Sequence, residues 1–350
     1  MLDISVIDPN LKVETKIKEE NIHFYDVLQP PFSVHGVFYE DGKFRRIPEA
    51  VAKTVSGGVR TLHANTAGGR VRFKTDSDYV AIHAKMDGIT RLSLLSLTGS
   101  AGFDLYVKEG EGQRYKGTFV PPLDMQDGFE SIIKFSDGQK MREITVNMPQ
   151  YSNVCRLYVG LQEGATVCIP EVYKYQGPIV YYGSSITQGV CASRPGNSYQ
   201  NIIARRLDAD YVNLGFSGSA KGEPEIVDYI CKMDMSLFVY DYDYNAPTPE
   251  HLQNTHEKLY LAVREAHPEI PVVMLSRPKL YLTTDDVKRR EIIRTTYLNA
   301  KARGENVYFI CGEDLMQYAG DSGLVDGVHP NALGFASMAR VLGDLLETIL

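Results

Sequence analysis

Hydroxyl, amide and imidazole groups directly follow the apolar runs in the second half of the chain. The first run leads into residues 183–189 (GSSITQG), the second into 213–218 (NLGFSG) and the third into 241–245 (DYDYN). A fourth polar segment, 326–331 (DGVHPN), precedes the last helical stretch. Acyl transfer requires a nucleophile, a base, a group that orients the base, and donors for an oxyanion. These segments contain a hydroxyl, an Asp/His pair, a glycine amide and a carboxamide, so they predict that chemistry.

Five strand-and-helix units must position these groups. From residue 179 to residue 350, apolar runs such as IVYYG and SLFVYDYD alternate with amphipathic segments such as SYQNIIARRL. Continuous apolar runs flanked by helices are typical of a parallel sheet that is covered on both faces. A doubly wound domain of this kind binds its ligands at the carboxyl ends of its strands. We therefore expect an α/β fold with a doubly wound, parallel five-stranded sheet and the polar segments at one edge of it.

The first half of the chain has a different period. Residues 34–175 consist of short runs rich in β-branched and aromatic residues, separated by Gly, Asp and Asn turns and without a helical period. In residues 78–86 (DYVAIHAKM) the apolar side chains alternate, as in a strand with one face in the core. Many short antiparallel strands predict an all-β sandwich of the jelly-roll type. We therefore divide the chain into a β-sandwich accessory domain, residues 1–175, and a catalytic α/β domain, residues 176–350.

Composition and charge argue against several classes of protein. The 350 residues are 43% hydrophobic and 23% charged, which is typical of a globular chain with two domains. The formal net charge of −7 argues against a nucleic-acid partner. We expect neither a membrane span nor a secretory signal, because no long apolar stretch and no basic N-terminal segment occur. The five cysteines form no CxxC pair, which favours reduced thiols and a cytoplasmic location.

Motifs for metals and cofactors do not occur in the sequence. We find no HExxH, no P-loop pattern and no GxGxxG that opens a helix. The GxSxG turn of the α/β-hydrolases is also missing. We therefore expect a reaction that uses neither a metal nor a cofactor.

Three short motifs resemble those of a known hydrolase family. Residues 183–187 (GSSIT) and 326–329 (Asp-x-x-His) resemble the first and last blocks of the SGNH (GDSL-like) hydrolases. Residues 102–106 (GFDLY) resemble the GxDLY signature of the β-domain that precedes the hydrolase domain in one branch of that family. The resemblance covers roughly residues 30–350 and implies a flavodoxin-like SGNH hydrolase domain. The branch is similar to carbohydrate esterases.

The resemblance also implies a role for each polar residue. Ser185 matches the nucleophile, His329 the base and Asp326 the residue that orients the base. The amides of Ser185 and Gly218 and the side chain of Asn245 match the oxyanion donors. Here GSS replaces the family's GDS, which leaves the identity of the nucleophile unchanged. The usual GxND block is replaced by DYDYN, so the role of Asn245 depends on its place after the third strand.

Three further residues are candidates for substrate binding. Arg194 follows the nucleophile closely, and its guanidinium can donate two parallel hydrogen bonds. An ordinary surface arginine is an equally good interpretation of Arg194. Tyr242 and Tyr244 lie at the rim of the expected site, where aromatic faces can pack against a sugar ring.

The other candidate residues also have purely structural interpretations. A serine at a strand-to-helix turn is commonly an N-cap, which is one interpretation of Ser185. Asp326 and Gly327 form a good turn, and Gly218 can be a turn glycine. Asn245 can be a helix cap. The combination of Ser185 with an Asp-x-x-His segment favours catalysis over these alternatives.

We therefore expect a serine esterase that removes a small acyl group, with acetyl as first choice, from a carbohydrate by a Ser-His-Asp mechanism. The substrate is then a small-molecule or oligosaccharide ester, with no nucleic-acid or membrane partner. Whether the protein forms a homo-oligomer is left open. Two alternatives remain: an acyl-lipid or thioester hydrolase of the same fold, and a non-catalytic carbohydrate-binding protein.

Overall fold

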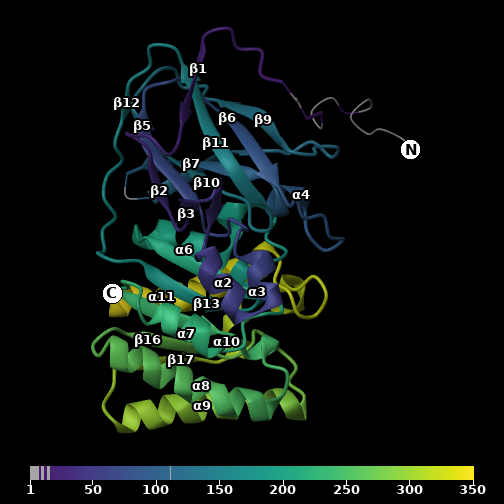
Figure 1. Ribbon diagram of the computed structural model, residues 1–350, viewed down its shortest axis with the longest axis vertical. Coiled ribbons are helices and arrows are strands. Elements are labelled where there is room, and N and C mark those ends of the chain that lie inside the picture. Colours follow the sequence, from purple (N-terminus) through teal and green to yellow (C-terminus); the bar gives the residue numbers. More distant parts are fainter. Residues whose placement is uncertain (1–7, 9–11, 14–15, 111) are drawn as a thin grey trace.

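A computed structural model describes residues 8, 12–13, 16–110 and 112–350 of the chain. Antiparallel sheets from the first half of the chain form one end of the molecule (Figure 1). A parallel sheet with helices on both sides forms the other end. The hairpin of α8 (Pro249–Ala266) and α9 (Thr284–Ala302) lies furthest from the antiparallel sheets.

Two antiparallel sheets enclose the core of the first half. One has the order β1 (Ile22–Asp26), β11 (Asn153–Gln162), β6 (Tyr79–Asp87), β9 (Gly128–Lys134). The other has the order β12 (Val167–Cys168), β5 (Arg70–Thr75), β10 (Arg142–Asn147), β7 (Phe103–Glu109), β8 (Gly112–Phe119). The strand β2 (Ser33–His35) pairs with β5, and β3 (Phe38–Glu40) pairs with β4 (Lys43–Arg45).

The two sheets pack face to face because alternate side chains of strands such as β6 are apolar and buried between them. Val80 and Ile82 of the first sheet are buried in one cluster with Phe73 and Ile144 of the second. Burying apolar side chains on one face of each sheet stabilises the pair. The predicted antiparallel sandwich is confirmed, whereas its jelly-roll type stays a prediction.

Helices in the first half differ from what the sequence analysis expects. The helices α2 (Glu49–Val55) and α3 (Gly57–Leu62) lie where only strands were predicted, and α4 (Leu97–Ser100) is a third short helix. Val51 and Val55 of α2 belong to one apolar cluster with Val59 and Leu62 of α3, but the extended Ser56 separates the two helices. Helices of seven and six residues are too short to show a helical period in the sequence. The expectation of strands alone is therefore wrong at residues 49–62.

The second half forms a parallel five-stranded sheet, as predicted. Its order is β14 (Tyr211–Gly215), β13 (Ile179–Gly183), β15 (Leu237–Asp241), β16 (Val272–Leu275), β17 (Val307–Ile310). One face is covered by α7 (Pro224–Ile230), α8 and α9, and the other by α6 (Tyr199–Leu207) and α11 (Ala332–Ile349). The short helices α5 (Ser185–Gln188) and α10 (Gly312–Leu315) follow the first and last strands along the chain. This is the doubly wound architecture that the sequence predicts.

The two halves share part of their cores. Ala52 of α2 and Val59 of α3 are buried with Phe216 and Ile226, on the face of the parallel sheet that α7 covers. The predicted division of the chain at residues 175 and 176 stays a prediction, but these two helices pack on the α/β side of it. No helix in the described part of the chain is both long and apolar enough to cross a bilayer.

Candidate active site

Ser185 is the first residue of α5 and follows β13 by two positions. The neighbouring Ser184 is the N-cap of this helix, since its hydroxyl accepts a hydrogen bond from the N–H of Ile186 at 3.2 Å. The N–H of Ser184 donates to the carbonyl of Asp241 at 2.9 Å, which fixes the turn to the adjacent strand. Capping is therefore done by Ser184, and the Ser185 hydroxyl is available for another contact.

That contact is with His329. Ser185 Oγ lies 3.1 Å from His329 Nε2, and His329 Nδ1 lies 2.7 Å from Asp326 Oδ2. The other carboxylate oxygen of Asp326 accepts hydrogen bonds from the N–H groups of His329 and Val328, at 2.8 and 3.0 Å. The structure therefore brings the predicted serine, histidine and aspartate into one continuous chain of contacts.

The environment keeps Asp326 ionised. Partial burial raises the pKa of its carboxyl group, but the hydrogen bonds from His329 and Val328 outweigh this effect, and the pKa lies below its ordinary value. An ionised Asp326 holds a proton on His329 Nδ1, which leaves Nε2 as an acceptor for the Ser185 hydroxyl. The side chains of His329 and Asp326 are 23% and 28% exposed, so an ester can reach the pair from solvent.

The candidate oxyanion donors come from three neighbouring strand ends. Gly183, Gly215 and Asp241 are adjacent in the register of the parallel sheet, so the loops that follow them emerge side by side. Within the described residues, the backbone N–H groups of Ser185 and Gly218 have no acceptor. Gly218 has a φ of +67°, a conformation that favours glycine. These two free N–H groups are suited to bind a developing oxyanion.

Asn245 ends the 3₁₀ helix η3 (Asp243–Asn245), which follows β15. Its Nδ2 donates to the carbonyl of Phe216 at 2.9 Å, which ties it to the loop that carries Gly218. The amide has a second hydrogen that this contact does not use. The structure therefore places Asn245 beside the loop with which the sequence analysis grouped it.

The Arg194 guanidinium contacts the sandwich half of the chain. Its Nη1 donates to Asp104 Oδ2 at 2.8 Å and to the hydroxyl of Tyr106, and its guanidinium lies 4.0 Å from the centroid of the Tyr115 ring. All three partners belong to the sandwich. The guanidinium is thus engaged in the contact between the two halves, and we do not assign it to substrate.

The two tyrosines expected at the rim of the site differ from each other. Tyr242 is 1% exposed, donates or accepts a hydrogen bond with Thr255 at 2.9 Å, and packs against Tyr182. A buried ring cannot pack against a sugar, so the prediction for Tyr242 is wrong. Tyr242 follows Phe238 and Tyr240 of β15 at alternate positions, and all three side chains are buried in the same cluster. Tyr244 is half-buried beneath the guanidinium of Arg277, 4.4 Å from its ring.

Two residues to which the sequence patterns assign no role, Gln188 and Tyr151, stabilise the site. Gln188 Oε1 accepts from the N–H of Ser217 at 3.0 Å, and its Nε2 donates to Asn65 Oδ1 at 3.1 Å. The Tyr151 hydroxyl donates to the carbonyl of Ser185 at 3.3 Å. These contacts join residues far apart in the sequence, and no spacing along the chain signals them.

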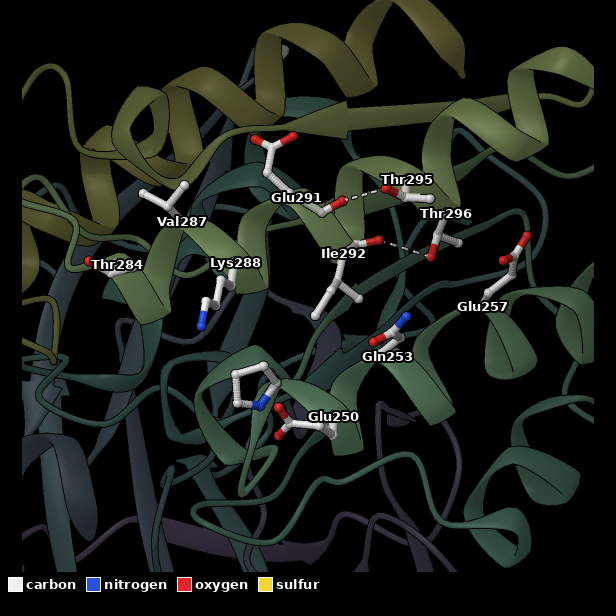
Figure 2. Close-up of a pocket in the computed structure, with 11 residues that line it drawn as sticks. Glu250, Gln253, Glu257, Thr284, Val287, Lys288, Glu291, Ile292, Thr295 and Thr296 are labelled. Atoms are coloured by element: carbon white, nitrogen blue, oxygen red, sulfur yellow. Dashed lines mark hydrogen bonds between the residues drawn. The ribbon is translucent and has the colours of Figure 1, made fainter.

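A groove of about 660 Å³ between α8 and α9 is separate from this site. Figure 2 shows Glu250, Glu257, Glu291 and Lys288 along its walls. None of the candidate residues described above lines it, so we do not assign it to the reaction. No group of three or more His, Cys, Asp or Glu side chains suited to a metal ion occurs within the described part of the chain.

Comparisons with known proteins identify the family that each half of the chain matches. Residues 176–347 match the sequence model of the GDSL-like lipase/acylhydrolase family, and residues 22–167 match the GxDLY model, the N-terminus of SGNH-hydrolase-type esterases. No protein with a curated description matches the sequence.

Solved structures with the same fold span nearly the whole chain. A GDSL-like lipase from Bacteroides ovatus is 26% identical with a TM-score of 0.83, and the match covers 94% of this chain and 98% of that one. The salicylyl-acyltransferase SsfX3 of a tetracycline biosynthetic pathway is 19% identical, with a TM-score of 0.77 and coverage of 95% and 99%. A family two carbohydrate esterase from Cellvibrio japonicus is 14% identical, with a TM-score of 0.62 and coverage of 94% and 98%.

Proposed function

Since residues 176–347 belong to the GDSL-like lipase/acylhydrolase family and residues 22–167 to the GxDLY domain of SGNH-type esterases, we propose that this protein is a serine esterase that removes a small acyl group from a carbohydrate. The observation that supports the proposal is the chain of contacts from Ser185 through His329 to Asp326. Nucleophile, base and orienting carboxylate stand within hydrogen-bond distance of one another, as this chemistry requires.

Acylation begins when Ser185 Oγ attacks the ester carbonyl and His329 Nε2 takes its proton. Asp326 holds the imidazole in the required tautomer and stabilises the imidazolium that forms. The oxyanion accepts hydrogen bonds from the N–H groups of Ser185 and Gly218 and from Asn245 Nδ2. His329 then gives its proton to the departing alcohol, which leaves an acyl group on Ser185. Water, deprotonated by the same histidine, attacks this acyl-enzyme. His329 then returns the proton to Ser185 Oγ as the acid is released.

As substrate of this esterase we propose an acetylated oligosaccharide. The chain's net charge of −7 suits a neutral substrate better than an anionic one. The shared fold with a carbohydrate esterase over 94% of the chain supports a sugar ester. An acyl-lipid or thioester hydrolase remains the alternative enzyme.

The decisive experiment compares Ser185→Ala with Ser184→Ala. Loss of the nucleophile should lower kcat on p-nitrophenyl acetate by at least about 10³-fold, because the remaining groups cannot form the acyl-enzyme. Ser184→Ala removes only the helix cap and should keep most of the turnover, with about 1 kcal/mol less stability. Substantial turnover in Ser185→Ala would refute the proposed nucleophile.

Substrate class is tested with the wild-type protein. Acetate release from acetylated oligosaccharides should exceed hydrolysis of long-chain acyl esters and of acyl thioesters at equal concentration. Faster hydrolysis of either of those would favour the alternative enzyme. Sugar binding without turnover of any ester would favour the non-catalytic alternative.

A further inference from the structure

The strand β14 is the edge strand of the parallel sheet, and it leads directly to the loop with Gly218. It pairs with β13 on one side, and the segment that precedes β5 lies along the other. At Gly68 the approach is so close that a Cβ atom would stand 2.9 Å from the Cβ of Asn213. Gly68 also has a φ of +82°, so this position requires glycine. The outer edge of β14 is therefore buried against the first half of the chain.

Buried carbonyl groups on this edge need donors that a neighbouring strand would otherwise supply. Two buried arginines supply them. Arg70 donates to the carbonyl of Tyr211 at 3.1 Å, near the start of β14. Arg46 donates to the carbonyls of Asn213, at 3.1 Å, and of Gly215, at the end of β14. Each arginine thus takes the place of a missing strand, at opposite ends of the same edge.

Within the described part of the chain, the guanidinium of Arg46 donates hydrogen bonds only to backbone carbonyl oxygens. The remaining donors reach the segment that covers β14, at the carbonyls of Asn65 (2.8 Å) and Leu62 (2.7 Å). The guanidinium carbon lies 4.7 Å from the centroid of the Phe216 ring, and the residue is 2% exposed. The planar guanidinium therefore fixes three things together: the end of β14, the covering segment and the first residue of the following loop.

The charge of Arg46 has no carboxylate partner among the described residues. Burial lowers the pKa of its guanidinium to about 9, so the group still carries its charge at neutral pH. A buried charge without a counter-ion is costly, and a neutral donor would satisfy the carbonyls at lower cost. What arginine adds is a rigid fork: Nη1 reaches the carbonyls of Asn213 and Gly215 on β14, while Nε and Nη2 reach the covering segment.

Both loop residues between the end of β14 and Gly218, Phe216 and Ser217, are fixed by a side-chain hydrogen bond. The Phe216 carbonyl accepts from Asn245, and the Ser217 N–H donates to Gln188. Both partners belong to the α/β half. Arg46 is the contact that fixes the start of the loop, at Gly215, from the sandwich half. The Gly218 N–H follows three residues later and has no acceptor within the described residues.

We propose that Arg46 is a positioning residue for the oxyanion hole: by fixing the end of β14 it aims the Gly218 N–H at the developing oxyanion. This inference rests on the proposed serine mechanism. Arg46 touches neither substrate nor the reacting atoms, so its effect must pass through the loop. Displacing a donor by a fraction of an ångström weakens a hydrogen bond that is strongest in the transition state.

The test compares Arg46→Lys with Arg70→Lys, because both residues are buried arginines on the same edge strand. The first readout is kcat and KM on p-nitrophenyl acetate. The second is the inhibition constant of phenylboronic acid: Ser185 Oγ adds to boron, its proton passes to His329, and a boronate oxygen occupies the oxyanion hole. Unfolding temperature is measured for each variant, so that loss of stability is separated from loss of catalysis.

Arg46→Lys should lower kcat and weaken boronic-acid inhibition by a similar factor, about 10-fold, with little change in KM. Arg70→Lys should lower the unfolding temperature but leave both catalytic readouts within about twofold. Equal effects of the two variants, or an Arg46→Lys variant with wild-type inhibition, would overturn the proposal. If Arg46→Lys does not fold, Arg46→Gln, which removes the buried charge and keeps an amide donor, is judged by the same criteria. Failure of boronic acid to inhibit the wild type would instead overturn the serine mechanism.

Discussion

Asp104 Oδ2 and Arg194 Nη1 lie 2.8 Å apart, and this pair joins the sandwich to the loop that follows α5. The same carboxylate oxygen accepts the N–H of Gly196 at 2.8 Å, and Oδ1 accepts from Asn147 at 2.7 Å. The side chain of Asp104 is wholly buried. The acid of the GxDLY signature therefore holds the two halves together.

Replacing this acid should destabilise the protein. Asp104→Asn leaves Arg194 without its counter-ion in a largely buried site, which should cost about 3 kcal/mol of the free energy of unfolding. Urea unfolding, followed by circular dichroism, measures this loss. Glu109 lies on the same strand as Asp104 and forms a surface pair with Lys116 of β8, so Glu109→Gln should cost nothing measurable. Equal stability of Asp104→Asn and the wild type would show that the pair does not join the halves.

Asp326→Asn should impair chemistry rather than binding. The amide cannot hold a proton on His329 Nδ1, so the imidazole no longer presents an acceptor to Ser185. We expect kcat to fall by about 10³- to 10⁴-fold with little change in KM. Steady-state kinetics on p-nitrophenyl acetate measure both constants. Asp321→Asn, at an exposed position of the 3₁₀ helix η4 (Gly320–Gly323), serves as the control and should retain wild-type values. A small effect of Asp326→Asn would mean that another group orients the histidine.

Asn245→Asp should be a severe change despite its nearly equal volume. The carboxylate replaces a donor with a negative charge next to the developing oxyanion. We expect kcat to fall by about 10²-fold or more, and Asn245→Ala, which removes the donor alone, to be less impaired. The same assay ranks the two variants. The reverse order would place Asn245 outside the oxyanion hole.

His256 should make the protein less stable in mild acid. Burial lowers the pKa of this histidine from 6.5 to about 3, and its Nδ1 is bonded to Thr296 at 2.9 Å. Between these pH values the unfolded chain binds a proton that the folded protein does not. Stability should therefore fall with pH below 6.5, by about 1.4 kcal/mol per unit from this residue.

Urea unfolding at several pH values between about 4 and 7 measures this slope. His256→Gln should have a shallower slope than the wild type. His23→Gln, at an exposed histidine of β1, should keep the wild-type slope. Parallel slopes in all three proteins would show that His256 is not neutral in the folded state.

Local patterns predicted most of the fold. The alternation in β6 and the apolar runs of the parallel sheet are each visible within a few residues, because burial imposes a short period. The place of Ser185 and of Asp326 and His329 also followed from local spacing, since the polar residues after parallel strands meet at one edge. The catalytic roles of these residues stay predictions.

Contacts between distant segments could not be predicted in this way. The helices at residues 49–55 and 57–62 are each too short to show a helical period, and their partner surface lies far along the chain. Tyr242 resembled a rim residue because its position after β15 is visible in the sequence, whereas the direction of its ring is not. Nothing near Arg46 in the sequence points to β14, because its acceptors are backbone carbonyls, which every residue has.

The packing of α2 and α3 on the parallel sheet also constrains how the chain can fold as it is synthesised. Every strand of the sandwich has been made once β12 is complete, but the apolar side chains of these two helices must wait for Leu214, Phe216 and Ile226. Domains usually fold as units in order from the N-terminus. Here the nascent sandwich carries an uncovered apolar surface until residues 214–226 have emerged from the ribosome.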